Sequence, residues 1–233
     1  MNQPDYIIED STLLLAERLA TDVANLLRSA IADRGRATLV VSGGSTPVPF
    51  FESLSKQALD WSRVQVTLAD ERWVASGHPD SNERLVRRHL LDNLAAEASF
   101  ISLHEPELTA AEAAPVVEQR LRDNALPFDV VVLGMGDDGH TASLFPGAEN
   151  LNDTLDLHRT PLCAAAIPPE AKHKRMTLTL RALVDTGHLL VHITGQKKRS
   201  VLEYALIDGS VNKAPITAVF MQDKVPATVY WAA

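Results

Sequence analysis

Four short apolar runs in this sequence each end abruptly in a glycine-rich or charged cluster, and they constrain the fold more than any other feature. They are LVVSGGST (39–46), VTLADER (66–72), VVLGMGDDGH (131–140) and VHITGQKK (191–198). Continuous runs of this length are typical of strands buried on both faces of a parallel sheet. Because ligands of such sheets bind beyond the carboxyl ends of the strands, we expect the four clusters to meet at one site.

Helical patterns separate these runs along the chain. Leucine and valine recur at three-to-four spacing over 11–34, where Ser11 is placed to cap the start and Gly35 the end. Further helices are predicted up to about 57, after a cap at Ser81 or Asn82, and over 110–122 and 198–206. Additional strands are predicted over 100–102, 175–180 and 228–231, and a turn-rich surface segment over 147–158. The alternation predicts an α/β fold with a largely parallel sheet, helices on both faces, and a single domain over 1–233.

Composition excludes several classes of function. With 45% hydrophobic and 22% charged residues, the chain has the make-up of a soluble globular protein. No apolar run approaches the roughly 20 residues that a membrane helix needs, and we expect no signal peptide. Cys163 is the only cysteine, which suits a reducing cytoplasm, and we expect it to pack rather than react. The net charge of −8 argues against nucleic-acid binding, so an anionic substrate would need a locally cationic pocket.

The cluster after the third apolar run has the residue types of a catalytic site. Gly134, Gly136 and Gly139 permit turns that side chains would block. We therefore expect Asp138 and His140 to lie close together just after the strand predicted at 130–133. A histidine can exchange a proton with water near neutral pH, so we interpret His140 as a general base. The alternative is that the segment 138–140 only forms a tight turn, in which the polar side chain is hydrogen-bonded within the protein.

The other glycine-rich segments leave alternatives open. GGSTP (43–47) either binds a phosphate with backbone N–H groups or is an ordinary turn with Ser45 or Thr46 as a helix N-cap. GMGDDG (134–139) matches the dinucleotide pattern G-x-G-x-x-G, but its two carboxylates and the nearby Pro146 disfavour nicotinamide binding. The ligand spacing of a metal site is absent around Asp70, Asp138 and His140, so we expect no metal.

At these residues the sequence resembles the 6-phosphogluconolactonase family of the pentose phosphate pathway. The resemblance extends over VSGGSTP (41–47), LADERWV (68–74), DSNERLVRRHLL (80–91), VVLGMGDDGHTASLFPG (131–147), RMTLTL (175–180) and TGQKK (194–198). It implies a Rossmann-like sheet similar to that of glucosamine-6-phosphate deaminase. It also implies hydrolysis of 6-phospho-D-glucono-1,5-lactone without a cofactor, by a cytoplasmic monomer or homodimer.

The resemblance assigns roles motif by motif. His140 would be the general base that activates water, with Asp138 as its acidic partner. The phosphate would be held by Gly44, Ser45, Thr46, Arg72, Arg175 and Lys198. Asp70 and Asn82 would lie near the sugar hydroxyls. The choice of Lys198 over Lys197 depends on a G-x-x-K spacing.

Two other functions fit parts of this pattern. An amino-sugar-phosphate isomerase or deaminase would use the same scaffold, but its related motif continues after the histidine with an Asn-Glu pair, whereas this chain continues TASLFP (141–146). A non-catalytic sugar-phosphate sensor would keep the phosphate cluster without needing a poised His140.

Overall fold

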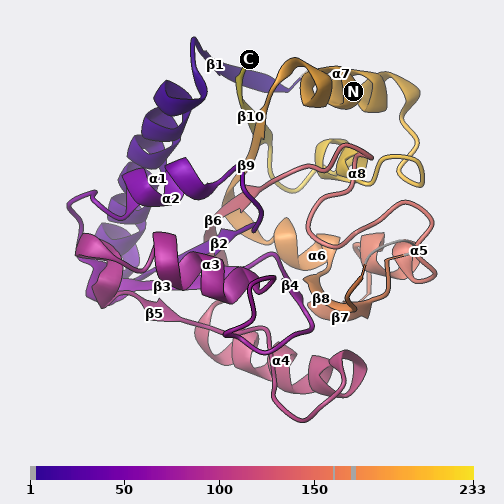
Figure 1. Ribbon diagram of the computed structural model, residues 1–233, viewed down its shortest axis with the longest axis horizontal. Coiled ribbons are helices and arrows are strands. Elements are labelled where there is room, and N and C mark those ends of the chain that lie inside the picture. The colour runs from indigo at the N-terminus through magenta and orange to yellow at the C-terminus, as the bar shows by residue number, and fades with distance from the viewer. Residues whose placement is uncertain (1–3, 160, 169–171) are drawn as a thin grey trace.

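A parallel sheet of seven strands forms the centre of the protein (Figure 1). The computed structural model describes residues 4–159, 161–168 and 172–233. In spatial order the strands are β1 (Asp5–Glu9), β10 (Ala227–Ala232), β9 (Thr186–Thr194), β6 (Phe128–Leu133), β2 (Ala37–Val41), β3 (Val64–Leu68) and β5 (Ser99–Phe100). Every neighbouring pair is parallel, which confirms the prediction of a largely parallel sheet.

Helices cover both faces of this sheet, as predicted. The long helix α1 (Thr12–Arg34) contacts β2, β6 and β10, and it begins at the predicted cap, with the Ser11 side chain accepting from the backbone N–H of Leu14. Figure 1 shows α1 and α2 (Val48–Leu54) on one side and α6 (Leu180–Leu183) on the other. The remaining helices are α3 (Asn82–His89), α4 (Ala110–Asn124), α5 (Leu151–Leu155), α7 (Gln196–Asp208) and α8 (Ile216–Met221), with 3-10 turns at Trp61–Arg63 and Asn93–Glu97.

A second, antiparallel sheet of three strands stands beside the first, and the sequence did not predict it. Its order is β4 (Asp70–Arg72), β8 (Arg175–Leu178) and β7 (Cys163–Ala166). The strand predicted over 175–180 forms β8, but β4 and β7 carry too few residues to show a period. Cys163 is buried in β7, and burial raises the pKa of its thiol to about 12, which confirms its expected packing role.

Several predicted boundaries are wrong. The strand predicted over 175–180 ends at Leu178, because the Thr179 side chain accepts from Ala182 N and caps α6. The strand predicted over 100–102 lies at 99–100, the segment 147–158 contains α5, and β1 was missed at the sheet edge.

The parallel direction of the main sheet positions the site. The carboxyl ends of β2, β3, β6 and β9 lie at one edge, so the four polar clusters gather there. After β3 the chain passes through Ala69 directly into β4, which joins the two sheets beside that edge.

Candidate active site

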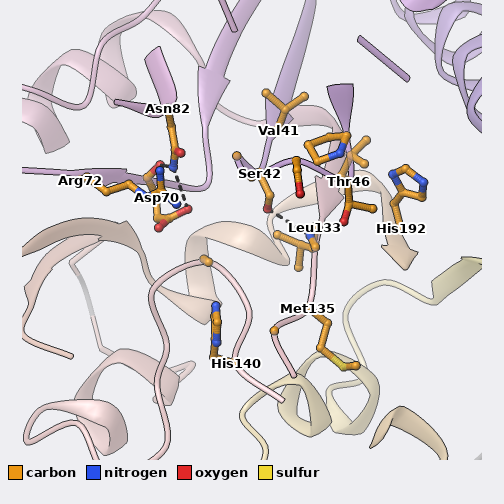
Figure 2. A pocket seen from close by; sticks show the side chains of 18 of the residues that line it. Val41, Ser42, Thr46, Asp70, Arg72, Asn82, Leu133, Met135, His140 and His192 are labelled. Atoms are coloured by element: carbon orange, nitrogen blue, oxygen red, sulfur yellow. Dashed lines mark hydrogen bonds between the residues drawn. The ribbon is translucent and has the colours of Figure 1, made fainter. Parts of the chain in front are cut away.

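A cavity of about 320 Å³ lies at this edge, and all four polar clusters contribute to its lining. Figure 2 shows Asp70, Arg72 and Asn82 on one side, Thr46 on another, and His140 on the loop that faces them. The predicted residues that line it are Gly44, Ser45, Thr46, Asp70, Arg72, Asn82, His140, Arg175 and Lys198. The fold therefore brings together residues that are up to 154 positions apart, from Gly44 to Lys198.

Asp138 does not line the cavity but holds the imidazole that does. Its Oδ1 lies 2.5 Å from Nδ1 of His140 and also accepts the backbone N–H of His140 at 3.1 Å. Partial burial opposes ionisation of Asp138, but the hydrogen bonds from His140 prevail and lower the pKa of the carboxyl. An ionised carboxylate accepts the Nδ1 proton, so Nε2 is the ring nitrogen left to take a proton from water.

Close approach of backbone to imidazole explains one of the loop glycines. A Cβ on Gly136 would lie 2.1 Å from Cε1 and 2.2 Å from Nδ1 of His140. Only glycine leaves this space. The Phe145 ring also packs on the imidazole, with a centroid separation of 4.3 Å. The imidazole therefore contacts both backbone and an aromatic side chain.

The antiparallel sheet supplies two arginines as directly paired residues, Arg72 on β4 and Arg175 on β8. Nη1 of Arg175 lies 4.0 Å from Oδ2 of Asp70, and Oγ of Ser143 donates to the same oxygen at 2.5 Å. Burial lowers the pKa of Arg175 and the Asp70 carboxylate opposes that shift. An arginine in a partly buried setting keeps its charge, so this side of the cavity is cationic.

Three polar atoms on this side are buried without a hydrogen-bond partner among the described residues. They are Nε of Arg72, Nε of Arg175 and Oδ1 of Asn82. Buried polar atoms usually have partners, and unpaired ones at a cavity are suited to a polar ligand. The amide of Asn82 is itself fixed, because its Nδ2 donates to the carbonyl of Asp70 at 2.8 Å.

Glu71 organises this corner and was missed by sequence reasoning. Its carboxylate accepts the backbone N–H groups of Asn82 at 2.8 Å and Glu83 at 2.7 Å, together with Oγ of Ser81 at 3.0 Å. Burial raises the pKa of Glu71, and these hydrogen bonds oppose the rise. The available signal was the helix start at 81–83, whose N–H groups need an acceptor.

The structure separates the two lysines at the start of α7. Lys198 lines the cavity, whereas Nζ of Lys197 lies 2.5 Å from Oδ2 of Asp137 outside it. The hydrogen bond from Lys197 lowers the pKa of Asp137. Position therefore favours Lys198 as the substrate ligand.

The turn after β2 is not an ordinary capped turn. Helix α2 begins at Val48, its capping residue is Pro47, and no side chain caps it, so the interpretation of Ser45 or Thr46 as an N-cap is wrong. Gly44 has φ of +98°, a conformation that glycine adopts readily. The loop at 134–139 is followed by turns and the strand–loop–helix of a dinucleotide site does not form there.

In the described part of the chain, the structure contains no group of three or more His, Cys, Asp or Glu side chains arranged to hold a metal ion. No helix in that part of the chain is long and apolar enough to cross a membrane.

Comparison with known proteins places this site in a family. The model of glucosamine-6-phosphate isomerases/6-phosphogluconolactonase matches residues 10–231. The chain belongs to this family. It is 48% identical to the 6-phosphogluconolactonase of Rhizobium meliloti over 97% of each chain. The crystal structure of a 6-phosphogluconolactonase from Shewanella baltica has a TM-score of 0.96 and 43% identity, and the match covers 100% of this chain and 99% of that one.

The expected fold class is also confirmed. A monomeric glucosamine-6-phosphate deaminase has a TM-score of 0.80 over 98% of this chain and 97% of its own, at 15% identity. That likeness concerns the fold alone.

Proposed function

We propose that this chain hydrolyses 6-phospho-D-glucono-1,5-lactone to 6-phosphogluconate, with His140 as the general base. The observation that carries the proposal is that one cavity contains the Asp138-oriented imidazole together with two arginines, a lysine and the Ser-Thr turn. The family relatives named above support the choice of substrate. The reaction belongs to the oxidative pentose phosphate pathway, and the cytoplasm is its proposed location.

In this mechanism Nε2 of His140 takes a proton from water as the water oxygen attacks the lactone carbonyl. The ester C–O bond then breaks, and the imidazolium returns the proton to the departing ring oxygen. Asp138 stabilises the imidazolium that forms between the two steps. Water is the only co-reactant, and the ester needs no covalent nucleophile.

The remote phosphate supplies binding energy that orients the carbonyl toward His140. Gly44, Ser45 and Thr46 offer backbone and hydroxyl donors, and Arg72, Arg175 and Lys198 offer charge. Asp70 and Asn82 are assigned to the sugar hydroxyls. The unpartnered Asn82 Oδ1 favours that assignment, because it is an acceptor suited to a hydroxyl proton.

The surroundings of the imidazole favour a lactonase over an amino-sugar-phosphate deaminase. After His140 the next carboxylate in the chain is Glu149, and the side chain that packs on the imidazole is the apolar ring of Phe145. A ring-opening isomerisation needs more than one acid–base group at the sugar. The Asn-Glu pair that follows the histidine in the deaminase motif is replaced here by Thr141 and Ala142.

The purified chain tests the proposal in parallel assays with phosphogluconolactone, glucosamine 6-phosphate and glucono-1,5-lactone, each corrected for spontaneous reaction. We expect acid release from the phosphorylated lactone far above background and no ammonia from glucosamine 6-phosphate. Ammonia release would establish the deaminase instead. Binding of the phosphorylated lactone without turnover would identify a sensor.

A further inference from the structure

One buried imidazole lines the cavity without a part in the proposed chemistry. His192 lies on β9, in the fourth polar cluster, and is 4% exposed. Its Nε2 has no hydrogen-bond partner within the described ranges of the chain. Leaving a buried polar atom unpaired costs stability, so its position calls for a partner that the protein itself does not supply.

His192 lines the cavity, and its aromatic neighbour cannot supply that partner. The edge-on ring of Phe50 lies at a centroid distance of 6.2 Å and is apolar. Figure 2 shows His192 on the side of the pocket where Thr46 lies, away from Asp70, Arg72 and Asn82. Thr46 on this side and the nearby Lys198 are two of the residues assigned to the phosphate.

The imidazole is uncharged in this position. Burial, helped by the nearby Lys198 charge, lowers the pKa of His192 to about 4. A neutral imidazole has one N–H donor and one acceptor. It can therefore donate to an anionic oxygen without placing a second positive charge beside Lys198.

We propose that His192 is a specificity-determining residue that donates a hydrogen bond to the phosphate end of the substrate, at its oxygen or at the water that hydrates it. The inference rests on the proposed function, because it takes the phosphorylated lactone as the ligand. Lys198, the 44–46 turn and His192 would then all donate hydrogen bonds to the phosphate from this side of the cavity. Its contribution is to select phosphorylated over unphosphorylated lactones.

The test compares His192→Phe, which fills the space without nitrogen, with His192→Gln, which retains an N–H donor. For His192→Phe we expect KM for phosphogluconolactone to rise about tenfold with kcat little changed, and kcat/KM for glucono-1,5-lactone to stay constant. The Gln variant is expected to recover part of the loss. His188→Gln, an exposed position on the same strand, is the control.

Equal losses on both lactones would show that His192 only packs the site, and an unchanged KM would show that it does not contact the phosphate end. Either result overturns the inference.

Titration with inorganic phosphate by calorimetry separates this inference from the proposed function. If the wild-type chain lacks lactonase activity, the proposed reaction fails, while a roughly tenfold loss of phosphate affinity in His192→Phe would still support the phosphate contact. An unchanged affinity of His192→Phe for inorganic phosphate would contradict the proposed contact between His192 and the phosphate. Near-ultraviolet circular dichroism confirms that each variant is folded. If His192→Phe does not fold, the kinetic constants of His192→Gln decide whether the inference holds.

Discussion

His140 lies against the Asp138 carboxylate, the Phe145 ring and the backbone of Gly136. In the proposed mechanism, an imidazole held by these contacts accepts a proton without first having to rearrange. A substitution that removes the His140 imidazole should therefore remove the proposed proton transfer while leaving most contacts with the substrate in place.

His140→Ala is expected to lower kcat by roughly 10²–10⁴ with KM nearly unchanged. Asp138→Asn should give a smaller loss, because the imidazole remains but its orientation and the stabilisation of the imidazolium weaken. Steady-state kinetics on phosphogluconolactone measure both. A His140→Ala rate equal to wild type would remove this residue from the mechanism.

The two adjacent lysines form a matched pair for testing the phosphate contact. Lys198→Met removes a charge from the cavity, and we expect KM to rise about 10- to 100-fold. Lys197→Met removes an exposed partner of Asp137 outside the cavity, and we expect KM within about twofold of wild type. The opposite ranking would assign the phosphate to Lys197.

At the scale of elements, β4 and the start of α3 are joined through one carboxylate. Glu71 accepts from the backbone of α3 and thereby sets the position of Asn82, while its chain neighbours Asp70 and Arg72 face the cavity. The residue acts through others, so its loss should change substrate binding more than the chemical step.

Glu71→Gln turns an amide NH₂ toward backbone N–H groups that need an acceptor. We expect KM to rise about tenfold with a smaller change in kcat, and the free energy of unfolding to fall by about 1–3 kcal/mol. Kinetics and urea unfolding measure the two effects. Glu97→Gln, at an exposed site, is the control. A fall in kcat at constant KM would contradict a positioning role.

The elements differ in how much the sequence reveals of them. The strands β2, β3, β6 and β9 were predictable because most of their residues are buried and apolar. The strands β4 and β7 were not, since three or four residues show no period, and their pairing depends on β8, which is distant in sequence. Most of the predicted site residues lie in motifs that follow strands, whereas Asn82 begins α3 and Arg175 begins β8. Glu71 was hidden among charged neighbours, and its role depends on a helix that starts eleven positions later.

At the scale of the whole molecule, a neutral buried histidine makes stability depend on pH. The pKa of His192 is about 4 in the folded chain and 6.5 in an unstructured one. Above about pH 6.5 this imidazole is unprotonated in both the folded and the unfolded chain. Between pH 6.5 and 4 it binds a proton only in the unfolded chain, which lowers the free energy of unfolding. The contribution is up to about 3 kcal/mol at pH 4.

We therefore expect the free energy of unfolding of wild type to fall between pH 6.5 and 4 more steeply than that of His192→Phe. Urea unfolding at several pH values measures the difference. His158→Asn, at an exposed position, should keep the wild-type slope. Parallel slopes for wild type and His192→Phe would show that this imidazole is protonated in the folded chain.

The contact between Gly136 and the imidazole has a use beyond this molecule. A Cβ at that position would lie within 2.2 Å of the ring, so the glycine and the present position of the imidazole go together. A relative that retains the histidine but carries alanine there must hold its imidazole in another position.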